Sequence, residues 1–361
     1  MVPMIDAHLD LAWNSIYFDR DLTLEVEEIR QREQGMADHP SRGRVTTSLA
    51  ALRRAGIGVA IVTLLARGGP SFRRASEGFR RTDLDYASPT SAYAVAKGQL
   101  AYYRLLEEQG HLRILLTASD LEEHWRRWNE NPSTPLGAII STEGTDPIVT
   151  PDQAQAWWED GLRAAGLAHY GPSQHAFGTG CSGPLTEAGR ALLKEMDLLG
   201  MLFDVTHLCD ESFWEALDLF GGSVLASHHN CRALVPGDRQ LADDQIKAIV
   251  QRDGVIGAPF DAWMMSPGWI IGETSPEAVS IEAAVDHLDH ICQLAGSARH
   301  VAIGSDLDGG FGTEQTPHEL DTIADLQQLE GILSRRGYSA EDIAAIFHGN
   351  WLRLLGRSLP A

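Results

Sequence analysis

The segment MIDAHLDL, residues 4–11, has the composition of a buried strand whose far end carries two polar residues, His8 and Asp10. Side chains alternate between the two faces of a strand, so residues two apart point the same way. An imidazole and a carboxylate placed side by side hold one divalent cation between them. Similar pairs also occur at solvated strand ends, so the rest of the chain has to decide between these two interpretations.

Four more apolar segments end in a residue of metal-ligand type, and segments with helical periodicity lie between them. Strands that alternate with helices form a parallel sheet, and in a closed barrel the carboxyl ends of such strands surround one active site. We therefore predict an α/β fold, a TIM-type (β/α)8 barrel with a metal site at the carboxyl ends of its strands. The four segments are LGAIISTE ending at Glu143, GMLFDVTH ending at His207, SVLASH ending at His228 and HVAIGSD ending at Asp306.

The strand count exceeds what such a barrel needs by one. Apolar runs at 58–65, 113–117, 166–171 and 254–259 join the five segments with polar ends, so nine candidates compete for eight positions. The run 113–117 lies closest to its successor and leads directly into a helix cap at Ser119-Asp120. We predict that this run lies outside the barrel.

Length and composition favour one large domain. The chain has 361 residues, of which 43% are hydrophobic, and it contains no evident linker. We expect a single barrel over residues 1–361, with loop excursions near 14–45 and 67–90 that lie over the barrel mouth.

Charge and cysteine usage limit the partners and the compartment. The formal net charge of −21 disfavours nucleic acid and anionic membranes as partners, because both require a basic face. No basic and apolar leader opens the sequence, and no apolar run approaches the roughly 20 residues of a membrane span. The four cysteines lack CxxC spacing, which is typical of free thiols in a reducing compartment. We expect a cytoplasmic protein.

A series of ordered sequence blocks between residues 4 and 355 resembles the bacterial form of the membrane (renal) dipeptidase family. The resemblance implies a binuclear zinc barrel of the amidohydrolase kind that cleaves dipeptides. It also implies a homodimer and tolerance of a D-residue at the carboxyl-terminal position of the substrate. The blocks are the HxD pair at 8–10, STEG at 141–144, PLTEAGR at 184–190 followed by DVTH at 204–207, ASH at 226–228, DRQ at 238–240, GSDLDG at 304–309 and GNWLR at 349–353.

The same resemblance implies two Zn²⁺ ions per chain. It assigns His8 and Asp10 to one zinc, His207 and His228 to the other, and Glu143 to both. Coordination chemistry agrees, because two neighbouring cations need a shared anionic donor and a carboxylate has two oxygens with which to bridge them. Two such ions would lower the pKa of a bound water and so would supply the nucleophile for hydrolysis.

Three further residues match positions with catalytic or binding roles in the family. Asp306 matches an acidic residue that takes the proton of the water and passes it to the leaving amine. Arg239 matches the residue that binds the substrate carboxylate, for which a planar guanidinium is well suited. A histidine that contacts the tetrahedral intermediate is harder to place, because residues 166–178 depart from the family pattern. We favour His175, and His169 is the competing assignment.

Two other functions remain open. A related metallohydrolase acting on another small amide, an N-acyl amino acid, a lactam or a lactone would share the barrel and the metals. A catalytically inactive binding protein would lack at least one ligand, and none is missing here. Arg239 distinguishes the dipeptidase from the related metallohydrolase, because a substrate without a free carboxylate has no need of this arginine.

Overall fold

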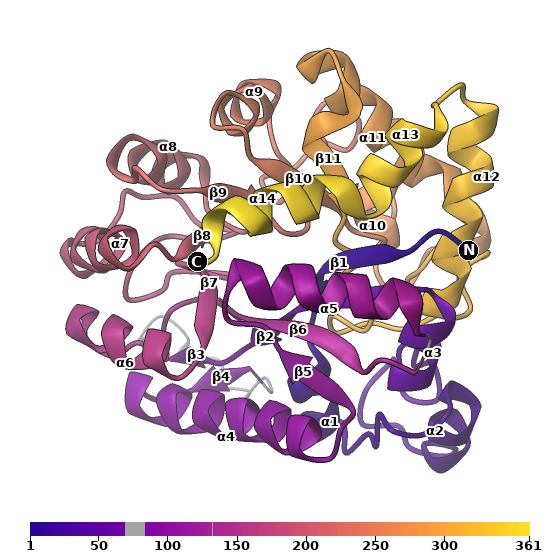
Figure 1. Cartoon of the computed structure of the whole chain (residues 1–361), viewed down its shortest axis with the longest axis horizontal. Coiled ribbons are helices and arrows are strands. Elements are labelled where there is room, and N and C mark those ends of the chain that lie inside the picture. Colours follow the sequence, from indigo (N-terminus) through magenta and orange to yellow (C-terminus); the bar gives the residue numbers. More distant parts are fainter. Residues whose placement is uncertain (69–83, 132) are drawn as a thin grey trace.

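The computed structural model describes residues 1–68, 84–131 and 133–361. Eight parallel strands follow one another around a nearly closed barrel with helices outside it, which confirms the predicted α/β barrel (Figure 1). Where β11 meets β1, the backbone N–H of Asp306 donates to the carbonyl of His8 at 3.3 Å. In spatial order the strands are β1 (Met4–Leu9), β2 (Ile57–Leu64), β6 (Leu136–Glu143), β7 (Leu162–Gly166), β8 (Leu202–Asp204), β9 (Val224–Ala226), β10 (Val255–Ala258) and β11 (Val301–Ile303).

The ninth strand candidate lies outside the barrel, as predicted. Among the described residues, strand β5 (Leu112–Ile114) pairs only with β6, in parallel, and Leu112 lies opposite Leu136. A separate two-stranded sheet is formed by β3 (Arg67–Gly68) and β4 (Asp85–Tyr86). These two short strands bound most of the expected excursion at 67–90, whose residues 69–83 lie outside the described residues.

The helices lie around the strands, and two of them close one end of the barrel. Inward-facing strand residues such as Ile61 and Ile139 form one apolar cluster with Leu121 of α5 and Trp351 of α14. The Trp351 indole also donates to the carbonyl of Ile303 at 2.9 Å. In Figure 1 both helices cross in front of the barrel strands. The helices are α1 (Leu11–Tyr17), α2 (Val26–Arg32), α3 (Leu49–Arg54), α4 (Pro89–Glu108), α5 (Ala118–Glu130), α6 (Ala154–Glu159), α7 (Glu187–Leu199), α8 (Asp210–Leu219), α9 (Asp243–Gln251), α10 (Ala262–Met265), α11 (Glu282–Ala295), α12 (Gln328–Arg335), α13 (Ala340–Ala344) and α14 (Asn350–Ser358).

Hydrogen bonds to Asp308 hold the excursion near 14–45 against the segment that follows β11. The side-chain amide of Asn14 donates to the carbonyl of Asp308 at 2.8 Å. The backbone N–H groups of Thr46 and Thr47 donate to the Asp308 carboxylate, each at 2.9 Å. Both ends of the excursion are therefore attached close to Asp306.

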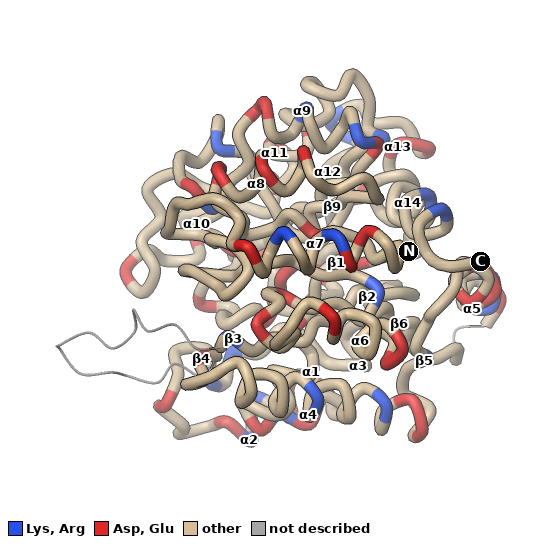
Figure 2. The backbone as a smooth tube through the Cα atoms, turned by 90° about the vertical axis from the view of Figure 1, so that its left-hand side faces the viewer, with Lys and Arg blue, Asp and Glu red and all other residues tan. Residues whose placement is uncertain are grey.

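The outer surface carries mixed charge. In Figure 2, Lys and Arg positions are scattered among the Asp and Glu positions on the side that faces the viewer. None of the described helices combines the length and apolar character needed to cross a membrane.

Candidate metal centre

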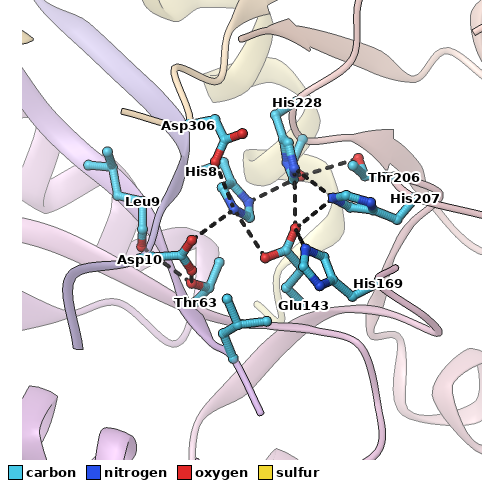
Figure 3. A network of polar contacts seen from close by, with 12 residues as sticks. His8, Leu9, Asp10, Thr63, Glu143, His169, Thr206, His207, His228 and Asp306 are labelled. Atoms are coloured by element: carbon cyan, nitrogen blue, oxygen red, sulfur yellow. Dashed lines mark hydrogen bonds and ion pairs between the residues drawn. The ribbon is translucent and has the colours of Figure 1, made fainter. Parts of the chain in front are cut away.

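The predicted ligands converge at the carboxyl ends of the strands. Figure 3 shows Glu143 with His8 on one side and with His207 and His228 on the other. Glu143 is the last residue of β6, His8 lies in β1, and the two other histidines follow β8 and β9. His207 has a φ of 68°, a left-handed conformation that is costly for a residue with a side chain and that recurs at functional sites.

Asp10 reaches the site by a route that the sequence pattern did not predict. β1 ends at Leu9, and its register on β2 shifts between Asp6 and Leu9. Asp10 therefore follows the strand, and simple strand alternation does not explain its position beside His8. The hydroxyl of Thr63 on β2 donates to Asp10 Oδ1 and orients the carboxylate.

Glu143 belongs to two groups of potential ligands. Its Oε1 lies 3.0 Å from His207 Nε2 and 3.2 Å from His228 Nε2, whereas its Oε2 lies 3.5 Å from His8 Nε2. His8 Nε2 in turn lies 3.8 Å from Asp10 Oδ2. Each group of three offers ligand atoms within 4.8 Å of one another, which is a spacing that one metal ion can span. The shared carboxylate is the arrangement expected for a bridging ligand.

The Nε2 atoms of His207 and His228 lie 3.2 Å from each other and point toward Glu143, while their Nδ1 atoms contact hydroxyl groups. His207 Nδ1 lies 3.0 Å from the Thr179 hydroxyl, and His228 Nδ1 lies 2.8 Å from the Ser227 hydroxyl. A hydroxyl that accepts from Nδ1–H fixes the tautomer whose Nε2 carries the lone pair. His8 Nε2 is buried and has no hydrogen-bond partner. These donor atoms fit a metal centre.

The electrostatics of the site favour a cation. Burial lowers the pKa values of His207 and His228 well below their usual range, so both are neutral, the form that binds metals. For His8, burial acts to lower the pKa, but the charges of Glu143 and Asp10 outweigh it and raise the pKa well above its usual value. The carboxylates that would keep a proton on His8 would equally attract a metal ion.

Asp306 faces the cavity and forms a third group of potential ligands with His8 and His228. Its Oδ1 is 3.8 Å from His8 Nε2, and its backbone also adopts a left-handed conformation, with a φ of 58°. Burial raises the pKa of Asp306 well above its usual value, and the charge of Glu143 adds to this rise. A carboxyl that faces the cavity in this position can exchange a proton with a water molecule or a substrate bound there.

A cavity of about 80 Å³ opens beside the ligands. Arg239 lies in its wall with only 2% of its surface exposed. Its Nη2 donates to the carbonyl of His228 at 3.1 Å, whereas its Nη1 is buried without a hydrogen-bond partner. A buried guanidinium nitrogen in this state is suited to an anionic ligand. The lining residues are Asp10, Trp13, Leu65, Leu84, Glu143, His169, Tyr170, His207, His228, Arg239, Asp261, Met264, Asp306, Gly309 and Gly310.

The structure places His175 away from the cavity, which corrects our preferred assignment. Its side chain is fully buried, its Nδ1 lies 2.9 Å from the Thr145 hydroxyl, and burial lowers its pKa to about 3. His169 lines the cavity instead, with Nε2 3.7 Å from Glu143 Oε1. The error arose because β7 ends at Gly166 and not near 171, so that His169 lies in the loop at the barrel mouth.

Asp261 is a cavity residue that the sequence analysis missed. It follows the apolar run 254–259, so it repeats the pattern of a buried strand closed by an acidic residue. That signal was present in the sequence, but the run was counted only as a strand.

A family model described as membrane dipeptidase (peptidase family M19) matches residues 1–358. The chain belongs to this family. Its members are metallopeptidases that cleave dipeptides, so the chain is a metallo-dipeptidase.

Individual relatives agree with this family assignment. A Klebsiella pneumoniae protein encoded in the pqqA 5′ region is 31% identical over 71% of this chain and 93% of its own length. An uncharacterized dipeptidase of Schizosaccharomyces pombe is 29% identical over 61% of this chain, and the match spans about half of that protein (52%).

Solved structures of the family share the fold. One is the crystal structure of dipeptidase AC, a metallopeptidase of family M19, which superposes with a TM-score of 0.79 at 22% sequence identity. The match covers 100% of this chain and 99% of the dipeptidase AC chain. A Rhodobacter sphaeroides metallopeptidase, solved with a phosphinate mimic of the dipeptide L-Ala-D-Ala, has a TM-score of 0.77 at 22% identity and covers 99% of both chains.

We expect His169 and His175 to differ sharply when each is replaced by alanine. His169→Ala should lower kcat by about 10²-fold, the scale of losing one donor at a reacting oxygen, with little change in Tm. His175→Ala should lower Tm by several degrees, because it removes a buried hydrogen-bonded side chain. Steady-state kinetics and thermal unfolding of the two variants provide the comparison. Equal effects on kcat would place both histidines in one functional unit and contradict the assignment to His169.

Proposed function

We propose that this chain is a zinc-dependent dipeptidase with two zinc ions per chain, which hydrolyses free dipeptides, including those with a D-residue at the carboxyl-terminal position. The observation that carries the proposal is the position of Glu143 between two groups of ligands, beside a buried Arg239 with an unpaired Nη1. Histidine nitrogens combined with carboxylates are ligands that zinc prefers. His8, Asp10 and Glu143 would hold one ion, and Glu143, His207 and His228 the other.

Two bound cations would polarise the scissile carbonyl and activate a water molecule. The remaining tasks belong to the side chains of the protein. Arg239 holds the carboxylate of the dipeptide and so sets the position of the peptide bond. Asp306 accepts the proton of the attacking water and delivers it to the leaving amine, for which its raised pKa is suited. His169 donates to the carbonyl oxygen as negative charge develops on it.

A second candidate keeps the metal centre and changes the substrate. Another small amide, an N-acyl amino acid, a lactam or a lactone would use the same metals and the same Asp306. The unpaired Nη1 of Arg239 favours a substrate with a free carboxylate. An N-acyl amino acid has that carboxylate too, so an N-acetyl amino acid, which lacks the free amine of a dipeptide, is a necessary comparison.

The test combines a change in the substrate with a change in Arg239. A charge-assisted contact is worth about 1.5 to 3 kcal/mol, so amidation of the dipeptide carboxylate should lower kcat/KM by about ten- to a hundredfold. Arg239→Met should cause a similar loss with the free acid and little further loss with the amide, because both changes remove the same interaction.

The controls for this cycle are Arg336→Met and a tripeptide series. Arg336 forms ion pairs with Asp286 and Asp289 on the outer surface, so its loss should leave kcat/KM unchanged. Tripeptides should be poor substrates, because their extra residue displaces the carboxylate from Arg239. If amidated dipeptides are cleaved as fast as free ones and Arg239→Met affects neither, the second candidate becomes the better function.

We further propose that the protein acts as a homodimer in the cytoplasm. The four cysteines are all free thiols in the structure, which agrees with a reducing compartment. The dimer rests on the family resemblance.

A further inference from the structure

Asp261 places a carboxylate in the cavity wall that the proposed reaction does not use. It follows β10, precedes α10 and is 6% exposed. Arg239, Tyr170 and Met264 line the same cavity. A carboxylate buried in a cleft requires an explanation, because its desolvation is costly unless a partner compensates for the charge.

The hydrogen bonds of Asp261 orient it without neutralising it. The Gln315 amide nitrogen donates to both carboxylate oxygens at 2.9 Å, and the Trp263 indole donates to Oδ2 at 2.6 Å. Both donors are neutral, and a carboxylate has room for about four hydrogen bonds in all. Burial raises the pKa of Asp261 to about 7, which is the behaviour of a carboxylate without an adequate cationic partner.

The electrostatic neighbours of Asp261 show which part of a substrate it would meet. The charge of Arg239 lowers the pKa of Asp261 and also acts on Glu143 and Asp306. Arg239 lines the same cavity as Asp261, Glu143 and Asp306. Because Arg239 binds the substrate carboxylate in the proposed function, Asp261 lies next to the carboxyl-terminal residue of the dipeptide.

We propose that Asp261 is a specificity-determining residue that selects dipeptides whose carboxyl-terminal residue has a cationic side chain, an amine such as that of lysine or ornithine. The inference rests on the proposed dipeptidase function and adds the substrate class. The ammonium supplies the positive charge that Asp261 lacks, and the pair would lie in a largely water-excluded site. Met264, Trp13 and Leu84 offer apolar surface for the methylene stem of such a side chain.

The competing explanation is that Asp261 only orients Arg239. The two explanations predict different patterns of loss. An orienting residue affects every dipeptide equally, because every dipeptide has the carboxylate that Arg239 binds. A residue that pairs with a substrate ammonium affects only substrates that carry one.

The experiment compares L-Ala-Lys with L-Ala-norleucine, whose side chains have nearly the same length and differ in the terminal ammonium, in both L and D forms of the second residue. We expect the wild-type protein to prefer lysine by about ten- to a hundredfold in kcat/KM. Asp261→Asn, which keeps the shape of the side chain, should abolish this preference and leave the norleucine peptide within about twofold of wild type. Asp261→Ala, with Tm measured for both variants, covers the case in which Asn disturbs folding.

The matched control is Asp321→Asn, which removes the same charge from an aspartate whose side chain is 67% exposed and does not line the cavity. It should leave the lysine preference unchanged. Equal losses of both peptides in Asp261→Asn, or a wild-type protein that cleaves both equally well, would overturn the inference while the dipeptidase function stands. If the wild type cleaves neither peptide, the dipeptidase function fails. Calorimetric titration with the two peptides then tests Asp261 by itself, and equal affinities would overturn the inference.

Discussion

Glu143→Gln is expected to lose metal and activity together. The Glu143 carboxylate belongs to both proposed ligand groups, with Oε1 3.0 Å from His207 Nε2 and Oε2 3.5 Å from His8 Nε2. An amide keeps the shape but loses the charge and one of the two oxygen donors. Loss of residues that only support a metal ligand already costs 10- to 100-fold in metal affinity or activity, so loss of the shared ligand should lower kcat/KM by more than about 10²-fold.

The measurement is elemental analysis beside kinetics, on protein prepared without chelator. Wild type should contain close to two equivalents of divalent metal, which is zinc in the proposed function, and Glu143→Gln one or fewer. Glu314→Gln is the control, because Glu314 is a part-buried carboxyl whose pKa burial also raises, and it lies outside the groups of potential ligands. A variant with full metal content and full activity would show that the two ions are bridged by another group. A wild-type value that stays near one equivalent after reconstitution would contradict the binuclear centre.

Asp306→Asn is expected to lower kcat by on the order of 10² or more, the usual contribution of a general acid-base group. The Asp306 carboxyl faces the cavity and lies 3.8 Å from His8 Nε2, at the rim of the ligand group. Asparagine fills the same space and accepts hydrogen bonds, but it cannot take a proton from water. KM should change much less than kcat, because Arg239 and not Asp306 holds the substrate carboxylate.

Metal analysis of Asp306→Asn distinguishes a loss of proton transfer from a loss of bound metal. If Asp306→Asn retains two equivalents of metal while kcat falls, the loss belongs to proton transfer. Asp308→Asn provides a contrast, because the Asp308 carboxylate accepts from Thr46 and Thr47 and should affect Tm more than kcat. An unchanged kcat with a raised KM in Asp306→Asn would assign Asp306 to substrate recognition.

The arrangement of strands could be predicted because each buried strand leaves a strong local signal. The run that ends at Glu143 is buried along its whole length, and the prediction matched β6 to the residue. The short strand β5 could also be excluded, because its closeness to the next run and the helix start after it are local features. The helix cap itself lies at Thr117 and not at Ser119 as predicted, because the Thr117 hydroxyl accepts from the backbone N–H of Asp120. The prediction for strand β7 was wrong. The strand was expected at 166–171, whereas it spans Leu162–Gly166. Alanine and glycine dominate 164–168, so hydrophobicity alone did not mark the end of that strand.

The sequence by itself determined the barrel, the end of it at which the polar residues gather, and the five ligand candidates that converge there, because buried strands that alternate with helices leave a periodic pattern in the chain. Only the tertiary structure decided which histidine faces the cavity and how Asp10 comes to lie beside His8. His169 and His175 are six residues apart in one loop region, and their environments differ because packing brings Thr145 to one and Glu143 to the other. Asp10 depends on a register shift in β1 and on Thr63 from the neighbouring strand. Contacts of this kind join residues that are far apart in the sequence, and no local pattern records them.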